Sequence, residues 1–346
     1  MASRRIWSVV IFLTTFVLLY NAFLAPETHS YRPWTKGASD ATTGIESETV
    51  EPSLPYTAAI LYLTSAHRSS ELFESLSALH NFVPGPAWPI LLMHTGDFDE
   101  EEARTEFITD LRTHIGTNNG SWAFAERIEF IKLDWTFPPG VSHDINVVDP
   151  VMPQVWPGYH QMCAFFTAPI FDLPRLKGLT YYMRFDTDSL ITAPLCYDPF
   201  EVMYQNQKSY GYVGITNDID EVTIGLRGLI HDYASAHPEV KARMDRNGWE
   251  WPHENEQGEM ITPPIRGYNN NFEIVKLSTF HRPDIKHWLQ ELTSVPERWY
   301  KYRWGDGPLR LATTSMFLEE KDLELFCGMR YYHQYNAKNE CPCVPL

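Results

Sequence analysis

Apolar and polar positions alternate from residue 56 onward in a way that predicts strands and helices in turn. Ala58–Leu63 and Pro89–His94 are short apolar runs, as expected for strands buried on both faces, and Ile128–Leu133 is a third predicted strand. The two segments between these strands carry apolar residues at helical spacing. The order strand, helix, strand, helix, strand predicts a three-layer α/β domain with a largely parallel sheet.

Capping residues mark where the first two helices are expected to begin. Ser69 and Ser70 are candidate N-caps of the first helix, and Asp99 is the candidate N-cap of the second. The apolar faces of these helices are predicted to be Leu72, Leu76 and Leu79 in the first, and Ala103, Phe107, Leu111 and Ile115 in the second.

The second half of the chain has a less regular pattern. Asp198 followed by Pro199 predicts another helix start, with Pro at the first helical position. Ile219–His237 and Pro283–Leu292 contain helical stretches with apolar faces. Asn247–Asn271 is rich in Trp, Pro, Gly and Asn, which predicts a long loop of the kind that often serves as a lid or a binding surface.

A fourth predicted strand, Tyr181–Phe185, ends in the carboxylate pair Asp186 and Asp188. Residues two apart in a strand share a face, so both carboxylates can bind one divalent cation. Arg184 lies on the same face, where it is expected either to contact the diphosphate or to hold Asp186. A metal bound by few protein carboxylates keeps positions for substrate phosphates, which indicates a pyrophosphate-bearing donor. The simpler interpretation is an Asp-rich junction between a strand and a turn.

The expected position of this pair in the sheet favours a ligand site. In open α/β sheets, ligands bind beyond the carboxyl ends of the strands. Arg68 follows the first predicted strand at that same edge, which makes it a candidate for contact with the nucleotide or its phosphates.

Charge and composition narrow the class of ligand. The chain has 346 residues and a formal net charge of −16, with 28 Lys and Arg against 44 Asp and Glu and no run of basic residues. This balance argues against a nucleic-acid partner, because neutralising phosphates needs a basic face. An acidic protein that binds an anionic nucleotide needs a metal ion or a few well-placed Arg residues.

The N-terminus carries a candidate membrane anchor. The uncharged run Ile6–Ala25 is long enough to cross a bilayer, and Arg4 and Arg5 before it place the N-terminus in the cytosol. The alternative is a cleavable signal peptide. We expect a transmembrane signal anchor at residues 1–25, a flexible stem at 26–55, a catalytic domain at 56–335 and a C-terminal tail at 336–346. The five cysteines predict some pairing in an oxidising lumen, with at least one free thiol.

Several segments together resemble one family, the fungal Golgi α-1,2-mannosyltransferases of glycosyltransferase family 15. These segments follow the family's order and cover most of the chain from residue 56 to residue 333; they are Tyr159–Phe166, Tyr181–Leu190, Asn271–Ile274, Arg303–Pro308 and Gly328–His333. The resemblance implies a GT-A fold that uses GDP-mannose and Mn²⁺, transfers mannose with retention, and lies in the Golgi lumen on a type II anchor.

The resemblance also implies roles for individual residues in the metal site. The family has Glu, Pro and Asp where this chain has Asp186, Thr187 and Asp188, so both carboxylate positions are kept and the first is one methylene shorter. His333 matches a family histidine that completes the metal site, and Mn²⁺ accepts both carboxylate and imidazole ligands.

The remaining implied roles concern the sugars. Glu273 matches the family's proposed nucleophile, although sequence does not distinguish a covalent from a front-face route. The alternative for Glu273 is a structural glutamate that satisfies buried amides. Tyr159 matches a tyrosine near donor and acceptor, and Trp304 with Asp306 forms a candidate sugar-binding pair of an aromatic face and a carboxylate. The segment Tyr268–Asn271 departs from the family pattern and is expected to influence acceptor choice.

Three functions are compatible with these patterns. The first is a Mn²⁺-dependent retaining α-1,2-mannosyltransferase that acts on mannose-terminated glycans of glycoproteins or glycolipids. The second is a GT-A enzyme that uses another donor such as a UDP-sugar, because Asp-x-Asp is widespread among such enzymes. The third is an inactive, membrane-anchored carbohydrate-binding protein.

Overall fold

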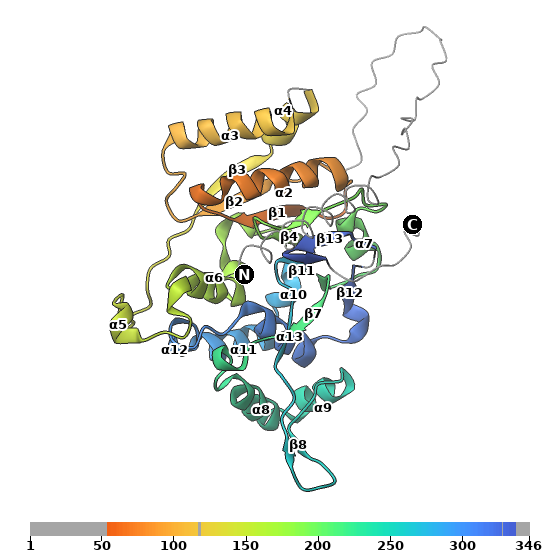
Figure 1. The fold of residues 1–346 in the computed structure, drawn as a ribbon. Helices are drawn as coiled ribbons and strands as arrows, with labels where there is room; N and C mark the ends of the chain where they lie inside the picture. Colours follow the sequence, from red (N-terminus) through yellow and green to blue (C-terminus); the bar gives the residue numbers. More distant parts are fainter. Residues whose placement is uncertain (1–53, 117–118, 327, 337–346) are drawn as a thin grey trace, which may run out of the picture. The chain divides into compact units, whose positions relative to one another are not determined.

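A seven-stranded sheet forms the centre of the described chain (Figure 1). The structure is a computed structural model that describes residues 54–116, 119–326 and 328–336, all of which belong to one unit, Leu54–Leu346. The expected anchor at residues 6–25 and nearly all of the expected stem lie outside the described residues. Within the described part, no helix is both long and apolar enough to cross a membrane.

The sheet is mixed and mostly parallel, as the sequence predicts. From edge to edge its strands are β12 (Leu323–Leu325), β6 (Tyr210–Tyr212), β11 (Phe272–Lys276), β4 (Tyr181–Phe185), β1 (Ala58–Leu63), β2 (Ile90–His94) and β3 (Ile128–Lys132). Only β11 runs antiparallel to its neighbours, β4 and β6, while every other neighbouring pair in this sheet is parallel. The carboxyl ends of β1 and β4 therefore lie at one edge, beside the start of β11.

Two helical layers cover the sheet because alternate strand residues face opposite sides. Ala58, Ile60 and Tyr62 of β1 pack into the core with α2 (Ser69–Phe82) and α3 (Glu101–Ile115). Ala59 and Leu61 pack on the other face, in the core that contains α6 (Gly158–Thr167), α8 (Leu226–Ala236), α11 (Pro283–Thr293) and α13 (Asp306–Phe317). The predicted three-layer α/β architecture is confirmed.

Shorter elements complete the described chain. The remaining helices are α4 (Asn119–Ala125), α5 (Ile145–Val148), α7 (Pro199–Gln205), α9 (Pro238–Arg246), α10 (Leu277–Phe280) and α12 (Glu297–Tyr300). Small sheets are formed by β7 (Ile215–Asn217) with β10 (Arg266–Tyr268), by β8 (His253–Glu254) with β9 (Met260–Ile261), and by β5 (Leu190–Ile191), β13 (Tyr331–His333) and β14 (Tyr335–Asn336). Short 3-10 helices lie at Ala66–Arg68, Pro153–Val155, Pro169–Asp172, Pro174–Leu176, Asp220–Val222 and Glu320–Asp322.

The predicted helix starts are correct in one case and wrong in two. Asp198 caps α7 by accepting a hydrogen bond from Phe200 N at 2.8 Å. Helix α2 begins at Ser69 itself, after Arg68, so neither serine is its N-cap. Asp99 is not the N-cap of α3, since Glu100 holds that position and Asp99 bonds Lys132 on β3 at 2.5 Å.

Two further expectations concern the loop and the cysteines. The segment 247–271 is not a plain loop, because β8, β9 and β10 lie in it and β10 pairs with β7. Its last residues thereby reach the sheet edge where β4 ends. Of the two cysteines in the described residues, Cys163 is a buried free thiol and Cys196 is disulfide-bonded, which agrees with the expectation of some pairing and at least one free thiol.

Candidate active site

A cavity of about 920 Å³ opens beyond the carboxyl ends of β1 and β4. This is the position where open α/β sheets bind ligands, and the volume is that of a site for a cofactor-sized molecule. Seven of the residues predicted to form the site line the cavity: Arg68, Tyr159, Arg184, Asp186, Asp188, Asp306 and His333. Glu273 and Trp304 do not line it.

The Asp186–Asp188 segment forms a tight turn at the end of β4. Asp186 N donates to the carbonyl of Asn271, which precedes β11, at 3.0 Å, and Ser189 N donates back to Asp186 O at 3.0 Å. The turn directs both carboxylates into the cavity, with side chains 28% and 25% exposed for Asp186 and Asp188. The pairing of β4 with β11 therefore sets the position of the acidic pair.

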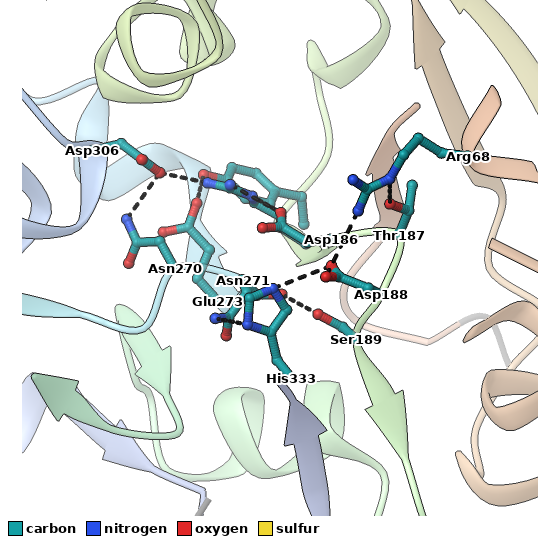
Figure 2. Close-up of polar contacts among 12 residues, drawn as sticks. Arg68, Asp186, Thr187, Asp188, Ser189, Asn270, Asn271, Glu273, Asp306 and His333 are labelled. Atoms are coloured by element: carbon teal, nitrogen blue, oxygen red, sulfur yellow. Dashed lines mark hydrogen bonds and ion pairs between the residues drawn. The ribbon is translucent and has the colours of Figure 1, made fainter. Parts of the chain in front are cut away.

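His333 reaches Asp188 because β13 pairs with β5, the short strand that follows the turn. Tyr331 is opposite Ile191 in this pairing, and His333 Nε2 lies 3.1 Å from Asp188 Oδ1 (Figure 2). Asn271 Nδ2 lies 2.9 Å from His333 Nδ1, and Tyr331 Oη donates to Asn271 Oδ1 at 2.8 Å. Both ring nitrogens of His333 thus have fixed partners.

These contacts determine the charge at this end of the cavity. The hydrogen bond from His333 lowers the pKa of Asp188 to about 2. Burial opposes a charge on His333, but the hydrogen bond to Asp188 raises the pKa of the imidazole above its ordinary value. Burial raises the pKa of Asp186, although Arg184 beside it acts in the opposite direction.

The predicted ligand set has the donor types that suit Mn²⁺. Two carboxylates and one imidazole line the same cavity, and Asp188 and His333 are already in contact. Among the described residues, however, no three His, Cys, Asp or Glu side chains are close enough together to enclose an ion by themselves. A metal here would therefore share its coordination with a ligand such as a diphosphate.

Arg184 is buried, with its side chain 1% exposed, and holds two carboxylates of the cavity wall. It donates from Nε and Nη2 to Asp186 Oδ1 at 3.2 and 3.0 Å, and from Nη1 to Asp306 Oδ2 at 2.6 Å. Its guanidinium lies 3.5 Å from the ring centroid of Phe166. Of the two roles expected for Arg184, the structure supports holding Asp186 rather than contacting a substrate.

Asp306 is the first residue of α13, and Arg184 holds it beside Asp186 in the cavity wall. Besides the Arg184 contact, Asp306 Oδ2 accepts a hydrogen bond from Asn270 Nδ2 at 3.2 Å, and Asn270 Oδ1 accepts from Tyr210 Oη at 3.0 Å. Asp306 lines the cavity but is only 6% exposed. It therefore presents one edge of a fixed carboxylate to a ligand.

Glu273 does not occupy the position expected of a nucleophile. Its side chain is fully buried on β11, where Glu273 Oε2 accepts from Arg310 Nε at 3.2 Å and Oε1 accepts from Tyr182 Oη at 2.7 Å. The antiparallel register places Glu273 opposite Arg184, on the inner face of the sheet that α13 covers. In this structure Glu273 is the buried counter-ion of Arg310, which fits a structural glutamate, and its role as a nucleophile stays a prediction.

Trp304 is the other predicted site residue that does not line the cavity. Its side chain is 3% exposed and its indole Nε1 donates to Ile224 O at 2.9 Å, with Arg298 over the ring. Gly305, Asp306 and Gly307 line the cavity, but the tryptophan beside them points into the core. Trp304 therefore fixes the segment that carries Asp306, and it offers no face to a sugar.

This assignment gives a testable expectation for Trp304→Phe. The substitution leaves Ile224 O without its indole donor, and we expect a loss of about 1–3 kcal/mol of unfolding free energy. The KM values for donor and acceptor should stay unchanged, since no ligand contact is removed. Thermal unfolding and steady-state kinetics on the same sample measure both. Unchanged stability with a raised acceptor KM would restore the sugar-binding role.

Tyr159 and Arg68 are the predicted residues with the most accessible side chains. Tyr159 is 43% exposed at the first turn of α6, with the Arg303 guanidinium 5.3 Å from its ring centroid. Cys163, burial and Asp306 raise the pKa of Tyr159, so its hydroxyl stays protonated and can donate. Arg68 Nε donates to Thr187 Oγ1 at 3.2 Å, and Arg68 Nη2 lies 3.6 Å from Asp188 Oδ2.

Sequence reasoning missed residues that connect the predicted ones. Asn269, Asn270 and Asn271 line the cavity, and Asn270 and Asn271 hold Asp306 and His333, respectively. Arg303 and Asp218 form a further pair in the wall, 3.2 Å apart. The three consecutive asparagines were visible in the sequence as a departure from the family pattern, but their contacts depend on strand pairing.

Comparison with known proteins identifies the family of the chain. The family described as Glycolipid 2-alpha-mannosyltransferase matches residues 87–346. This chain belongs to that family. The match includes every predicted site residue except Arg68, and it confirms the resemblance found in the sequence.

Relatives and solved structures agree with membership of the mannosyltransferase family. Probable mannosyltransferase MNT3 of Candida albicans is 28% identical over 202 residues, covering 54% of this chain and 50% of that protein. O-glycoside alpha-1,2-mannosyltransferase homolog 5 of Schizosaccharomyces pombe is 24% identical over 258 residues, covering 62% and 60%. The chain thus spans about half the length of the curated relatives that it matches.

Two solved structures show the fold. The mannosyltransferase Ktr4p from S. cerevisiae in complex with GDP has a TM-score of 0.64 at 20% identity, covering 84% of this chain and 77% of that one. Core-mannan synthase A from Aspergillus fumigatus in its Mn/GDP form has a TM-score of 0.63 at 16% identity, covering 90% and 86%. The expected GT-A-type glycosyltransferase fold is confirmed.

Proposed function

We propose that this protein is a retaining α-1,2-mannosyltransferase that transfers mannose from GDP-mannose to mannose-terminated glycans of glycoproteins or glycolipids, with Mn²⁺ as cofactor. The observation that carries the proposal is the cavity beyond β1 and β4, in which Asp186, Asp188 and His333 lie together with Arg68. Membership of the family supports the mannosyl transfer. The GDP and Mn/GDP forms of the two solved relatives support the donor and the metal.

In this proposal the donor diphosphate binds at the Asp188 end of the cavity. Asp188, His333 and Asp186 would hold Mn²⁺, which neutralises charge on the leaving diphosphate when it is bound. Arg68 lies beside Asp188 with a 39% exposed side chain, so its guanidinium can turn toward a phosphate. The strongly negative net charge of the chain makes this local positive charge necessary for an anionic donor.

The sugars are proposed to bind toward the Asp306 wall. Asp306 accepts hydrogen bonds from sugar hydroxyls there, and the protonated Tyr159 hydroxyl donates to a sugar or phosphate oxygen. In the reaction the bond from the mannose anomeric carbon to the diphosphate oxygen breaks, a bond to the acceptor oxygen forms, and the acceptor proton leaves with GDP. Because Glu273 lies outside the cavity, we favour a front-face route over a covalent intermediate on Glu273.

We further propose that the protein is a single-pass type II membrane protein of the Golgi. The uncharged run at residues 6–25 after two arginines supports an anchor, and the polar segment 26–55 supports a stem. The domain at 56–335 would then lie in the lumen, where donor and glycan meet. When the full chain is expressed, we expect detergent to extract it from membranes and carbonate to leave it in them.

The function is tested by incubating the protein with GDP-mannose, methyl α-mannoside and Mn²⁺ and analysing the product by NMR. An α-1,2-linked dimannoside is the expected product, formed by retention. A panel of nucleotide sugars is the comparison, and faster turnover of a UDP-sugar would establish the alternative donor. Mannoside binding without turnover of any donor would identify a carbohydrate-binding protein.

A further inference from the structure

A second cavity, of about 500 Å³, lies on the opposite side of α6 from the candidate active site. Helix α6 lies between the two cavities, and residues on its opposite faces line different cavities. Tyr159 and Met162 line the first cavity, whereas Gln161, Ala164 and Phe165 line the second. The spacing of three and four residues between Gln161, Ala164 and Phe165 places them on one helical face.

Two more structural links join the cavities. Trp135 lines both of them, so it forms a shared wall. Trp299 and Tyr300 of α12 line the second cavity, and the chain that follows them carries Arg303 and Asp306 into the first. Helices α12 and α6 are packed together (Figure 1). His160 Nδ1 lies 2.5 Å from Trp299 O. A ligand in the second cavity therefore lies next to the elements that hold Tyr159 and Asp306.

The lining of the second cavity combines aromatic and proline surfaces with polar side chains. The apolar part is formed chiefly by Trp135, Phe165, Trp299, Tyr300, Pro138 and Pro169. The polar part includes Gln161, Thr136, Thr293, Asp134 and Asp172. Trp135 is the partly exposed aromatic side chain of this wall, and an aromatic surface beside hydrogen-bonding groups matches a pyranose, which has an apolar face and a ring of hydroxyls.

Charge and hydrogen bonding narrow the choice of ligand. Lys132 is the only cation among the residues that line this cavity, and it is already paired with Asp99 at 2.5 Å. Asp134 and Asp172 also line the cavity, so the cavity does not favour an anion. A hydrocarbon chain would bury the polar groups without partners, whereas sugar hydroxyls supply them.

We propose that the second cavity binds a saccharide unit of the acceptor glycan, remote from the mannose that reacts. This inference rests on the proposed function only for the identity of the acceptor, because saccharide binding can be measured without any donor. The expected consequence is that the protein prefers a mannooligosaccharide to a single mannose, since only the longer acceptor reaches past Trp135.

The test compares methyl α-mannoside, an α-1,2-linked mannotetraose and octyl α-mannoside as acceptors. For the wild-type protein we expect a KM for the tetraose about tenfold below that for methyl α-mannoside, which equals about 1.4 kcal/mol of added binding. Ala164→Trp fills the second cavity from α6 without adding atoms to the first. It should raise the KM for the tetraose about tenfold and change the KM for methyl α-mannoside less than about twofold.

Two variants make the comparison decisive. Ala236→Trp adds the same side chain at an exposed position on α8 that lines neither cavity, and it should change neither KM. Gln161→Ala removes a polar group from the second cavity with little steric change, and it should raise the KM for the tetraose about threefold. This variant replaces Ala164→Trp as the test if Ala164→Trp does not fold. The proposal would be overturned if the wild type had equal KM values for methyl α-mannoside and the tetraose. It would also be overturned if Ala164→Trp raised both of these KM values by the same factor.

Direct titration with mannotetraose, without donor, separates this inference from the proposed function. Binding by the wild type and its loss in Ala164→Trp support the second cavity even if GDP-mannose is not turned over. Absence of tetraose binding overturns the inference whatever the donor is. A gain in affinity for octyl α-mannoside in place of the tetraose would assign the cavity to an apolar aglycone, which also overturns it.

Discussion

Glu273→Gln is expected to lower the free energy of unfolding by about 3 kcal/mol, because it leaves the buried guanidinium of Arg310 without its counter-charge. Arg310 is 2% exposed and bonds Glu273 Oε2 at 3.2 Å, and its guanidinium lies 4.8 and 4.7 Å from the ring centroids of Phe171 and Phe280, which are stacked on each other. The glutamine keeps the volume and an oxygen for Tyr182, but it brings an amide donor or a neutral oxygen toward Arg310. A midpoint of thermal unfolding lower by about 10 °C is the corresponding observation.

The matched control is Glu126→Gln, the same change at an exposed position, which should shift stability by less than about 0.5 kcal/mol. Below its unfolding range, Glu273→Gln should bind GDP with Mn²⁺ as the wild type does. Glu273 would be assigned to the reaction centre by a different outcome. In that case Glu273→Gln would unfold at the wild-type temperature and bind GDP normally, but it would transfer mannose more than about 100-fold more slowly.

The layers of the fold could be predicted because they depend on local patterns. The apolar runs at β1, β2 and β4 and the periodic faces of α2 and α3 identify buried strands and amphipathic helices without knowledge of their partners. The turn after β4 could be predicted for the same reason, since two aspartates directly after a buried strand have to leave the core. What the pattern does not contain is the direction of β11, which reverses between β4 and β6.

The details of the site depend on these non-local pairings. Asn271 meets Asp186 and His333 only because β11 is antiparallel to β4 and β13 pairs with β5. Asn270, next to Asn271 in the chain, likewise donates a hydrogen bond to Asp306 at the start of α13. No local pattern relates positions so far apart in the chain, so the sequence predicted the acidic turn but not the asparagines that hold its partners.

Glu273 and Trp304, the two predicted site residues that do not line the cavity, owe their positions to the same physical cause. Both lie in segments that line the cavity, but the side chain turns to the other side of the backbone. Glu273 faces α13, where Arg310 supplies its counter-charge, and Trp304 faces the core, where Ile224 O accepts its N–H. A motif identifies the segment that forms a site, whereas the direction of each side chain follows from packing partners elsewhere in the chain.

Asp188 is the residue whose replacement should affect the proposed donor site most. It contacts His333 Nε2 at 3.1 Å and Arg68 Nη2 at 3.6 Å, and its pKa of about 2 keeps it ionised at any working pH. Asp188→Asn has the same size but no charge. We expect the Mn²⁺-dependent affinity for GDP to fall about 100-fold, equal to about 2.8 kcal/mol.

The measurement is a titration with GDP in the presence of Mn²⁺ or of a chelator. In the wild type the chelator should abolish tight binding, whereas Asp188→Asn should bind GDP weakly and equally in both conditions. Asp232→Asn, an isosteric loss of charge at an exposed position on α8, should leave Mn²⁺-dependent binding unchanged. Because Asp188 is partly exposed and its neighbours keep hydrogen-bonding partners, the variant should fold normally, so weak binding reports the site and not unfolding. Metal-dependent GDP binding of wild-type strength in Asp188→Asn would remove Asp188 from the metal site and transfer that role to Asp186.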